Sequence, residues 1–276
     1  MSRRGILAAA ALGSAATLLG AGVARADQPG EYHPAPDGPA PDDGVSVLAL
    51  VTQSEVNNEP TYYEVNGART SFRYEPTFYS RMELWHQRWR QWTPNHWTAP
   101  HQIYCYGVYV NKPGMHGEGR AFDLARLLIT NRNNGTMFLG FNGRYDQWST
   151  WSTDAMITER IRYWGTLASL HYHFRHVISY LDNSEHHNHV HIDNAISGGG
   201  DSSFATSSST QTLFVQATCR YIWGFDTGID GEFGPQTQSH SAAVLSRLGS
   251  DGSITTQSRW QVFCRGSALQ AWAMRP

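Results

Sequence analysis

The chain has 276 residues, 40% of them hydrophobic and 12% aromatic, so it is long enough for one large domain or two smaller ones with a buried core. Its formal net charge is −2, which argues against a general nucleic-acid-binding protein, because such proteins carry a basic surface.

The N-terminus has the pattern of a secretory signal. Arg3 and Arg4 precede an Ala- and Leu-rich stretch that runs to about Val23, and Ala24-Arg25-Ala26 is a small-x-small cleavage site. We therefore expect residues 1–26 to be a signal peptide that leaves a mature chain with no membrane span. The paired arginines favour the twin-arginine export route, with an ordinary Sec signal as the alternative.

Two composition breaks divide the rest of the chain. Residues 27–44 are rich in Pro, Asp and Gly, which is typical of an extended linker, and residues 198–210 form a Gly/Ser-rich linker. We expect a large domain over residues 45–197 and a small one over 211–276.

The large segment predicts a mixture of helices and strands. Apolar residues at helical spacing predict a helix over 79–92, and a second helix is expected to begin near Asp154. Strands are expected over 103–110, 121–130 and 189–193. Because these elements do not alternate strictly as strand, helix, strand, they indicate an α+β domain.

Histidines gather in one short segment. Four of the thirteen fall within six residues, namely His186, His187, His189 and His191. Since side chains alternate along a strand, His189 and His191 should point to the same face. Upstream, glycines in His116-Gly-Glu-Gly-Arg-Ala-Phe-Asp123 would let the chain turn sharply enough for its His and Asp to converge.

Zinc chemistry accounts for this set of side chains. A catalytic zinc takes three protein ligands from His, Asp and Glu and keeps a fourth position open. Amide hydrolysis also needs a base near the metal and a group that stabilises the oxyanion, and an additional histidine suits both roles. The alternatives are a buried His–Asp hydrogen bond and an exposed metal-scavenging patch. An HNH-type nuclease is disfavoured because the chain is not basic.

Both motifs resemble one family. His116-Gly-Glu-Gly-Arg-Ala-Phe-Asp123 is similar to the H-x-x-G-R-A-x-D motif of D-Ala-D-Ala carboxypeptidase-type metallopeptidases, in the group named for lysostaphin, these peptidases and sonic hedgehog. The run from His186 to Asp193 resembles the H-x-x-H-x-H-x-D ending of extensin-like C-terminal domains and murein endopeptidases of that group.

The resemblance implies a small antiparallel sheet with flanking helices and one zinc ion held by His116, Asp123 and His191. It also implies that His186 is the general base or transition-state stabiliser and that His189 lies close to the metal. Peptidoglycan would be the partner and the cell wall the location.

The sequence departs from the carboxypeptidases at the base. They use E-x-x-H, whereas Glu185 is followed by His186, His187 and Asn188, so Glu185 ranks below His186 as the base. The arginine that would bind the substrate carboxylate is left open among three candidates, Arg69, Arg73 and Arg81. Carboxypeptidase and endopeptidase activity are therefore both kept.

The C-terminal segment resembles a small all-helical peptidoglycan-binding module. Gly228 to Thr237 is similar to the D-G-x-F-G-P-x-T signature of such modules, with a tight turn at Asp230-Gly231 and a helix start at Pro235. The alternative is a helical domain without affinity for sugars.

The chain has three cysteines, and in an exported protein Cys219 and Cys264 are expected to form a disulfide that leaves Cys105 free.

Two functions from different classes follow. The first is a secreted zinc peptidase that hydrolyses peptide bonds of peptidoglycan stems or cross-links. The second is a non-catalytic, zinc-containing cell-wall-binding protein, whose site would be closed by a fourth protein ligand such as His189.

Overall fold

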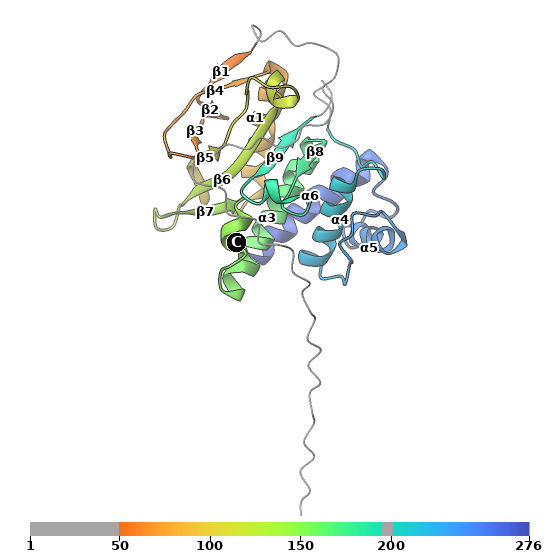
Figure 1. Ribbon diagram of the computed structural model, residues 1–276. Coiled ribbons are helices and arrows are strands. Elements are labelled where there is room, and N and C mark those ends of the chain that lie inside the picture. The colour runs from red at the N-terminus through yellow and green to blue at the C-terminus, as the bar shows by residue number, and fades with distance from the viewer. Residues whose placement is uncertain (1–49, 195–200, 276) are drawn as a thin grey trace, which may run out of the picture.

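The computed structural model describes residues 50–194 and 201–275 (Figure 1). The predicted signal peptide, the Pro-rich linker and the first residues of the Gly/Ser linker lie outside this range. The helices are α1 Pro76–Trp92, α2 Tyr145–Trp148, α3 Thr153–His173, α4 Ser209–Tyr221, α5 Pro235–Arg247 and α6 Gln257–Met274. The strands are β1 Val51–Gln53, β2 Glu55–Val56, β3 Glu59–Tyr63, β4 Phe72–Tyr74, β5 Trp97–Cys105, β6 Ala121–Asn131, β7 Met137–Asn142, β8 His176–Ile178 and β9 Val190–Asp193.

The main sheet has seven strands in the order β2-β3-β5-β6-β9-β8, with β7 also paired to β6. The α+β class is confirmed, but the expectation of an antiparallel sheet is wrong at one pairing, since β3 and β5 run parallel. The connection between them contains β4 and α1, and parallel neighbours need a crossover of this kind. The sheet is therefore mixed.

Most predicted elements are present with shifted ends. Helix α1 begins at Pro76, earlier than the expected residue 79, because the Glu75 side chain accepts hydrogen bonds from two backbone N–H groups of the first turn. Helix α3 follows Ser152, not Asp154. The strand expected over 103–110 instead occupies Trp97–Cys105, and a register shift against β6 at Tyr104/Cys105 accompanies its end.

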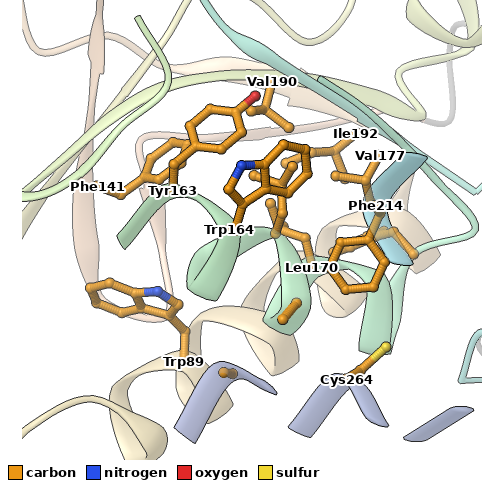
Figure 2. Packing of buried hydrophobic residues seen from close by; sticks show 14 of the residues in the cluster. Trp89, Phe141, Tyr163, Trp164, Leu170, Val177, Val190, Ile192, Phe214 and Cys264 are labelled. Carbon is orange, nitrogen blue, oxygen red and sulfur yellow. The ribbon is translucent and has the colours of Figure 1, made fainter. Parts of the chain in front are cut away.

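Helix α3 lies at the centre of the hydrophobic core, between the segment that carries the sheet and the C-terminal helices. It packs against α1 and β7, and also against α4 and α6 of the C-terminal segment (Figure 1). The core cluster includes Trp89 of α1, Trp164 of α3, Phe214 of α4 and Cys264 of α6 (Figure 2). The C-terminal helices therefore share one core with the segment that carries the sheet.

Aromatic rings hold α6 against that segment. Trp272 of α6 is 3% exposed, and its ring centroid lies 6.1 Å from that of Trp89 and 5.2 Å from that of Trp97. The helices α3 and α6 approach so closely that a Cβ added at Gly165 would lie 2.6 Å from the Cβ of Ala271. Three tryptophans, Trp89, Trp97 and Trp272, are thus part of this interface.

The described part of the Gly/Ser-rich linker is packed against both segments. Ser202 and Phe204 are buried, and the Ser202 hydroxyl donates to the His171 carbonyl oxygen and accepts from Trp260 Nε1. The Asp201 carboxylate lies 3.3 Å from the buried guanidinium of Arg81. Residues 201–204 therefore connect the two segments through specific contacts.

Two further observations concern membrane-spanning helices and the cysteines. Among residues 50–194 and 201–275, no helix combines the length and the apolar character that a membrane crossing requires. Cys105, Cys219 and Cys264 are all buried and unpaired, and the Cys219–Cys264 disulfide stays a prediction.

Candidate metal centre

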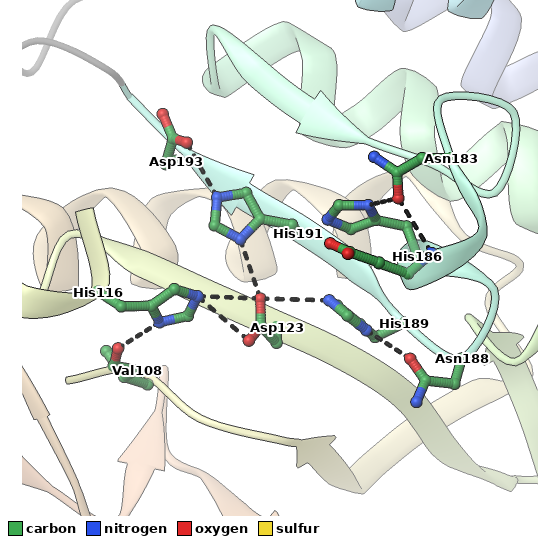
Figure 3. Close-up of polar contacts among 10 residues, drawn as sticks. Val108, His116, Asp123, Asn183, His186, Asn188, His189, His191 and Asp193 are labelled. Carbon is green, nitrogen blue, oxygen red and sulfur yellow. Dashed lines mark hydrogen bonds and ion pairs between the residues drawn. The ribbon is translucent and has the colours of Figure 1, made fainter. Parts of the chain in front are cut away.

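The pairing of β6 with β9 brings two of the predicted ligands together. Asp123 and His191 are direct partners in this antiparallel register, so their side chains lie on the same face of the sheet. His116 comes from the 3₁₀ turn Met115–Glu118 that precedes β6. One nitrogen of each histidine and one oxygen of Asp123 all lie within 4.8 Å of one another, and all three side chains are fully buried (Figure 3).

Two glycines allow the turn that carries His116. A Cβ added at Gly117 would lie 1.8 Å from the Lys112 carbonyl oxygen, so no larger residue fits there. Gly119 ends the turn with a φ of 70°, a left-handed conformation that favours glycine. The glycines of the motif thus place His116 beside Asp123.

The outer nitrogens of His116 and His191, the two candidate ligand histidines, donate to oxygen atoms. His116 Nδ1 donates to the Val108 carbonyl oxygen at 2.6 Å, and His191 Nε2 donates to Asp193 Oδ2 at 2.9 Å. The inner nitrogens face Asp123, with His116 Nε2 at 3.2 Å and His191 Nδ1 at 3.0 Å from Oδ1. Ligand histidines in metal sites have this arrangement, in which an outer hydrogen bond fixes the tautomer and the ring.

The charges of this group depend on one another. Burial would raise the pKa of Asp123, but the neighbouring His116, His189 and His191 hold it well below its usual range. Burial would lower the pKa of His191, but hydrogen bonds to Asp123 and Asp193 raise it to about 10. The carboxylates of Asp123 and Asp193 thus stabilise a positive charge at His191. Either a proton on the ring or a bound metal ion can supply that charge.

The donor set fits a zinc ion. Two imidazoles and one carboxylate are a common ligand set for zinc, and Zn–N bonds of about 2.0–2.1 Å place neighbouring ligand atoms roughly 3.3 Å apart in a tetrahedral site. The separations of 3.0 and 3.2 Å between the imidazole nitrogens and Asp123 Oδ1 are close to that spacing. Two of the three pairs of candidate ligand atoms therefore already have a spacing close to that of a tetrahedral zinc site, and all three atoms lie within 4.8 Å of one another.

Two further histidines lie beside this group. His186 is fully buried and His189 is 3% exposed, and their ring centroids are 5.0 Å apart. Their Nδ1 atoms donate to Asn183 Oδ1 and Asn188 Oδ1, which leaves both Nε2 atoms buried and without a hydrogen-bond partner among the described residues. Burial lowers the pKa of His186 to about 2 and that of His189 to about 4, so both rings are neutral.

His189 is close to the centre but outside the group of three. Its Nε2 lies 3.5 Å from Asp123 Oδ1, yet only His116, Asp123 and His191 form a possible metal-holding group within the described residues. The predicted strand 189–193 begins one residue late, at Val190, and His189 directly precedes it.

The other predicted site residues lie in different environments. Glu185 is exposed, whereas His186 is buried next to the group. Arg69 pairs with Glu55 on the surface, and Arg81 lies in the interior beside Asp201. The guanidinium of Arg73 lies 4.7 Å from the centre of the ring of Tyr109, the residue that follows Val108.

Sequence reasoning missed several residues of this environment. Val108 acts through its backbone oxygen, for which a sequence carries no signal, and Tyr106 packs its ring edge-on against His189 at 5.8 Å. Asn183 could have been found, because Asn before a short helical turn is a typical N-cap.

The signature of the C-terminal segment is organised around Gln216. Its Nε2 donates to Asp230 Oδ1 at 2.7 Å and to the Glu232 carbonyl oxygen at 3.0 Å, while its Oε1 accepts from the N–H groups of Asp230 and Gly231. Gln216 itself is buried. The conformation of the Asp230–Gly231 turn is thus fixed by contacts inside the segment.

Comparisons with models of known protein families, with curated proteins and with solved structures find no match for this chain.

Proposed function

We propose that this protein is a secreted zinc peptidase that hydrolyses peptide bonds in the stems or cross-links of peptidoglycan. The observation that carries the proposal is the buried group of His116, Asp123 and His191, with two more neutral imidazoles directed at it. The chemistry that a bound zinc ion supplies is Lewis acidity, which polarises a peptide carbonyl and acidifies water.

The residues around the centre would bind the ion, orient the ligand rings and accept a proton. His116, Asp123 and His191 would hold the ion, and Val108 and Asp193 keep the two ligand rings in orientation. His186 presents an unprotonated Nε2 toward the centre and would accept the proton that water gives up on attack. His189, whose Nε2 is also unprotonated, is the alternative acceptor.

A non-catalytic zinc protein is the second candidate, and burial favours it. The five side chains of the centre are at most 3% exposed, as in a structural site. The number of candidate ligands favours the enzyme, because a structural zinc site is closed by four protein ligands, whereas three residues form the group in residues 50–194 and 201–275.

The choice of substrate rests on the motifs and on the C-terminal segment. Both histidine motifs resemble those of peptidoglycan peptidases, and the helical segment resembles peptidoglycan-binding modules. The hydrophobic core of the C-terminal helical segment is continuous with the core of the segment that carries the sheet. A cell wall bound to the helical segment would therefore be held in one orientation relative to the metal centre.

The test is digestion of purified muropeptides by the zinc-loaded protein, with products identified by mass. Loss of a terminal residue would indicate a carboxypeptidase, and cleavage of cross-linked dimers would indicate an endopeptidase. His186→Ala should retain zinc and lose turnover by on the order of 10²–10⁴-fold, the usual contribution of a general base, while Glu185→Gln should change it little. Intact muropeptides after long incubation would leave the non-catalytic zinc protein as the better account.

A further inference from the structure

Asn183 makes two hydrogen bonds that together fix the chemistry of His186. Its Oδ1 accepts from the backbone N–H of Glu185 at 3.0 Å and from His186 Nδ1 at 2.7 Å (Figure 3). A backbone N–H can only donate, so the side-chain atom that faces it must be the amide oxygen and not the amide nitrogen. The orientation of the Asn183 amide is thereby set by the backbone.

This orientation determines where the proton of His186 resides. An amide oxygen can only accept, so the imidazole must carry its proton on Nδ1. The lone pair then resides on Nε2, which is buried and has no hydrogen-bond partner among the described residues. The ring of His186 lies with its centroid 6.0 Å from that of His191 and 5.0 Å from that of His189.

We propose that Asn183 is a positioning residue that holds His186 in the Nδ1–H tautomer, so that its Nε2 lone pair is directed at the metal centre. The inference rests on the proposed function, because that function gives the lone pair a proton to accept, the one that the attacking water gives up. Asn183 also begins the 3₁₀ turn Ser184–His186, so one oxygen both caps the turn and orients the imidazole.

Removing the acceptor should free the tautomer. Without an oxygen at this position either ring nitrogen can carry the proton, and molecules with Nε2–H cannot act as the base. We expect Asn183→Ala to lower kcat by on the order of 10- to 100-fold with little change in KM, a part of the 10²–10⁴-fold that a general base contributes.

The direct readout is the tautomer itself. Zinc-loaded protein labelled with ¹⁵N-histidine should show His186 with a protonated Nδ1 and a bare Nε2 in long-range ¹H–¹⁵N NMR spectra. Asn183→Asp keeps an acceptor oxygen and should preserve this pattern. Asn183→Ala and Asn183→Ser should lose it, although the Ser hydroxyl can still cap the Glu185 N–H.

The serine variant separates orientation of the ring from capping of the turn. A further control is Asn134→Ala, which removes a similar capping side chain from an exposed turn between β6 and β7, where Asn134 Oδ1 accepts from the Thr136 N–H at 3.0 Å. This control should leave the His186 spectrum, the zinc content and kcat unchanged.

Two results would overturn the inference. One is a wild-type His186 with its proton on Nε2, and the other is an unchanged Nδ1–H pattern in Asn183→Ala with zinc retained. Neither result depends on hydrolysis, so an inactive wild-type protein with the expected spectra would refute the proposed peptidase while leaving the tautomer control by Asn183 in place.

Discussion

Truncation of Trp272 tests whether the C-terminal helices stabilise the segment that carries the candidate metal centre. The side chain lies on α6 but packs on Trp89 of α1 and Trp97 of β5, and it is 3% exposed. Trp272→Ala would leave a cavity between these three elements. Since Gly165 and Ala271 already bring α3 and α6 into close contact, the helices have little freedom to close that cavity.

The expected loss of stability follows from this packing. Replacement of a buried Trp by Ala typically costs about 3–5 kcal/mol, and we expect the upper half of that range because the site cannot collapse. Such a loss is a large fraction of the roughly 5–15 kcal/mol by which most domains are stable. The shared core predicts that the loss affects the whole protein.

The assay is guanidinium unfolding followed by far-ultraviolet circular dichroism and, separately, by release of zinc to a chromogenic chelator. Both midpoints should fall together in Trp272→Ala. Leu269→Ala is the matched control, since Leu269 lies on the same helix and is 40% exposed, and it should cost less than about 1 kcal/mol. An unchanged midpoint for zinc release in Trp272→Ala would refute the idea of a shared core.

Two further predictions concern single buried side chains. Burial raises the pKa of Glu159 from 4.5 to about 7 despite the nearby Arg162, so the folded state holds a proton that the unfolded state releases between these pH values. The free energy of unfolding, measured by urea titration, should therefore fall by about 3 kcal/mol as pH rises from 4.5 to 7. Glu159→Gln should remove this contribution to the pH dependence. Identical pH dependence in the two proteins would contradict the burial of this carboxyl. Gln216→Ala should cost about 1–3 kcal/mol in thermal unfolding, because the exposed Asp230 turn loses its hydrogen bonds to the buried Gln216 side chain, whereas the exposed Gln238→Ala should cost far less. Equal costs for the two variants would show that Gln216 does not organise the turn.

The three proposed ligands could be named from the sequence through its resemblance to the metallopeptidases, and local patterns agreed with that choice. The glycines after His116 indicated a sharp turn, and the alternation around His191 indicated a strand. The structure brings both together with Asp123 through the β6–β9 register, which no local pattern specifies. The convergence could be inferred only from that resemblance and from residue types that suit one metal ion.

The surroundings of the centre could not be predicted in the same way. The oxygen that orients His116 belongs to the backbone of Val108, and any residue type could supply it. Asn183 could be recognised as an N-cap candidate, but its contact with His186 could not, because a short 3₁₀ turn leaves no periodic pattern in the sequence.

The mixed sheet and the packing of α6 could not be predicted from the sequence either. Strand β3 contains Glu59 and Pro60, both uncommon in strands, and its parallel pairing with β5 is a long-range contact. The apolar spacing over residues 79–92 predicted a helix, but it gave no sign that Trp272, far along the chain, packs against Trp89 of that helix.

Zinc content is the measurement that tests the central claim most directly. Elemental analysis of the dialysed wild-type protein should give about one zinc per chain, because His116, Asp123 and His191 form a single three-ligand group within the described residues. Asp123→Ala should bind almost none, since the variant lacks the carboxylate between the two imidazoles. A wild-type chain that binds no zinc, or an Asp123→Ala chain that binds a full equivalent, would contradict the metal centre described here.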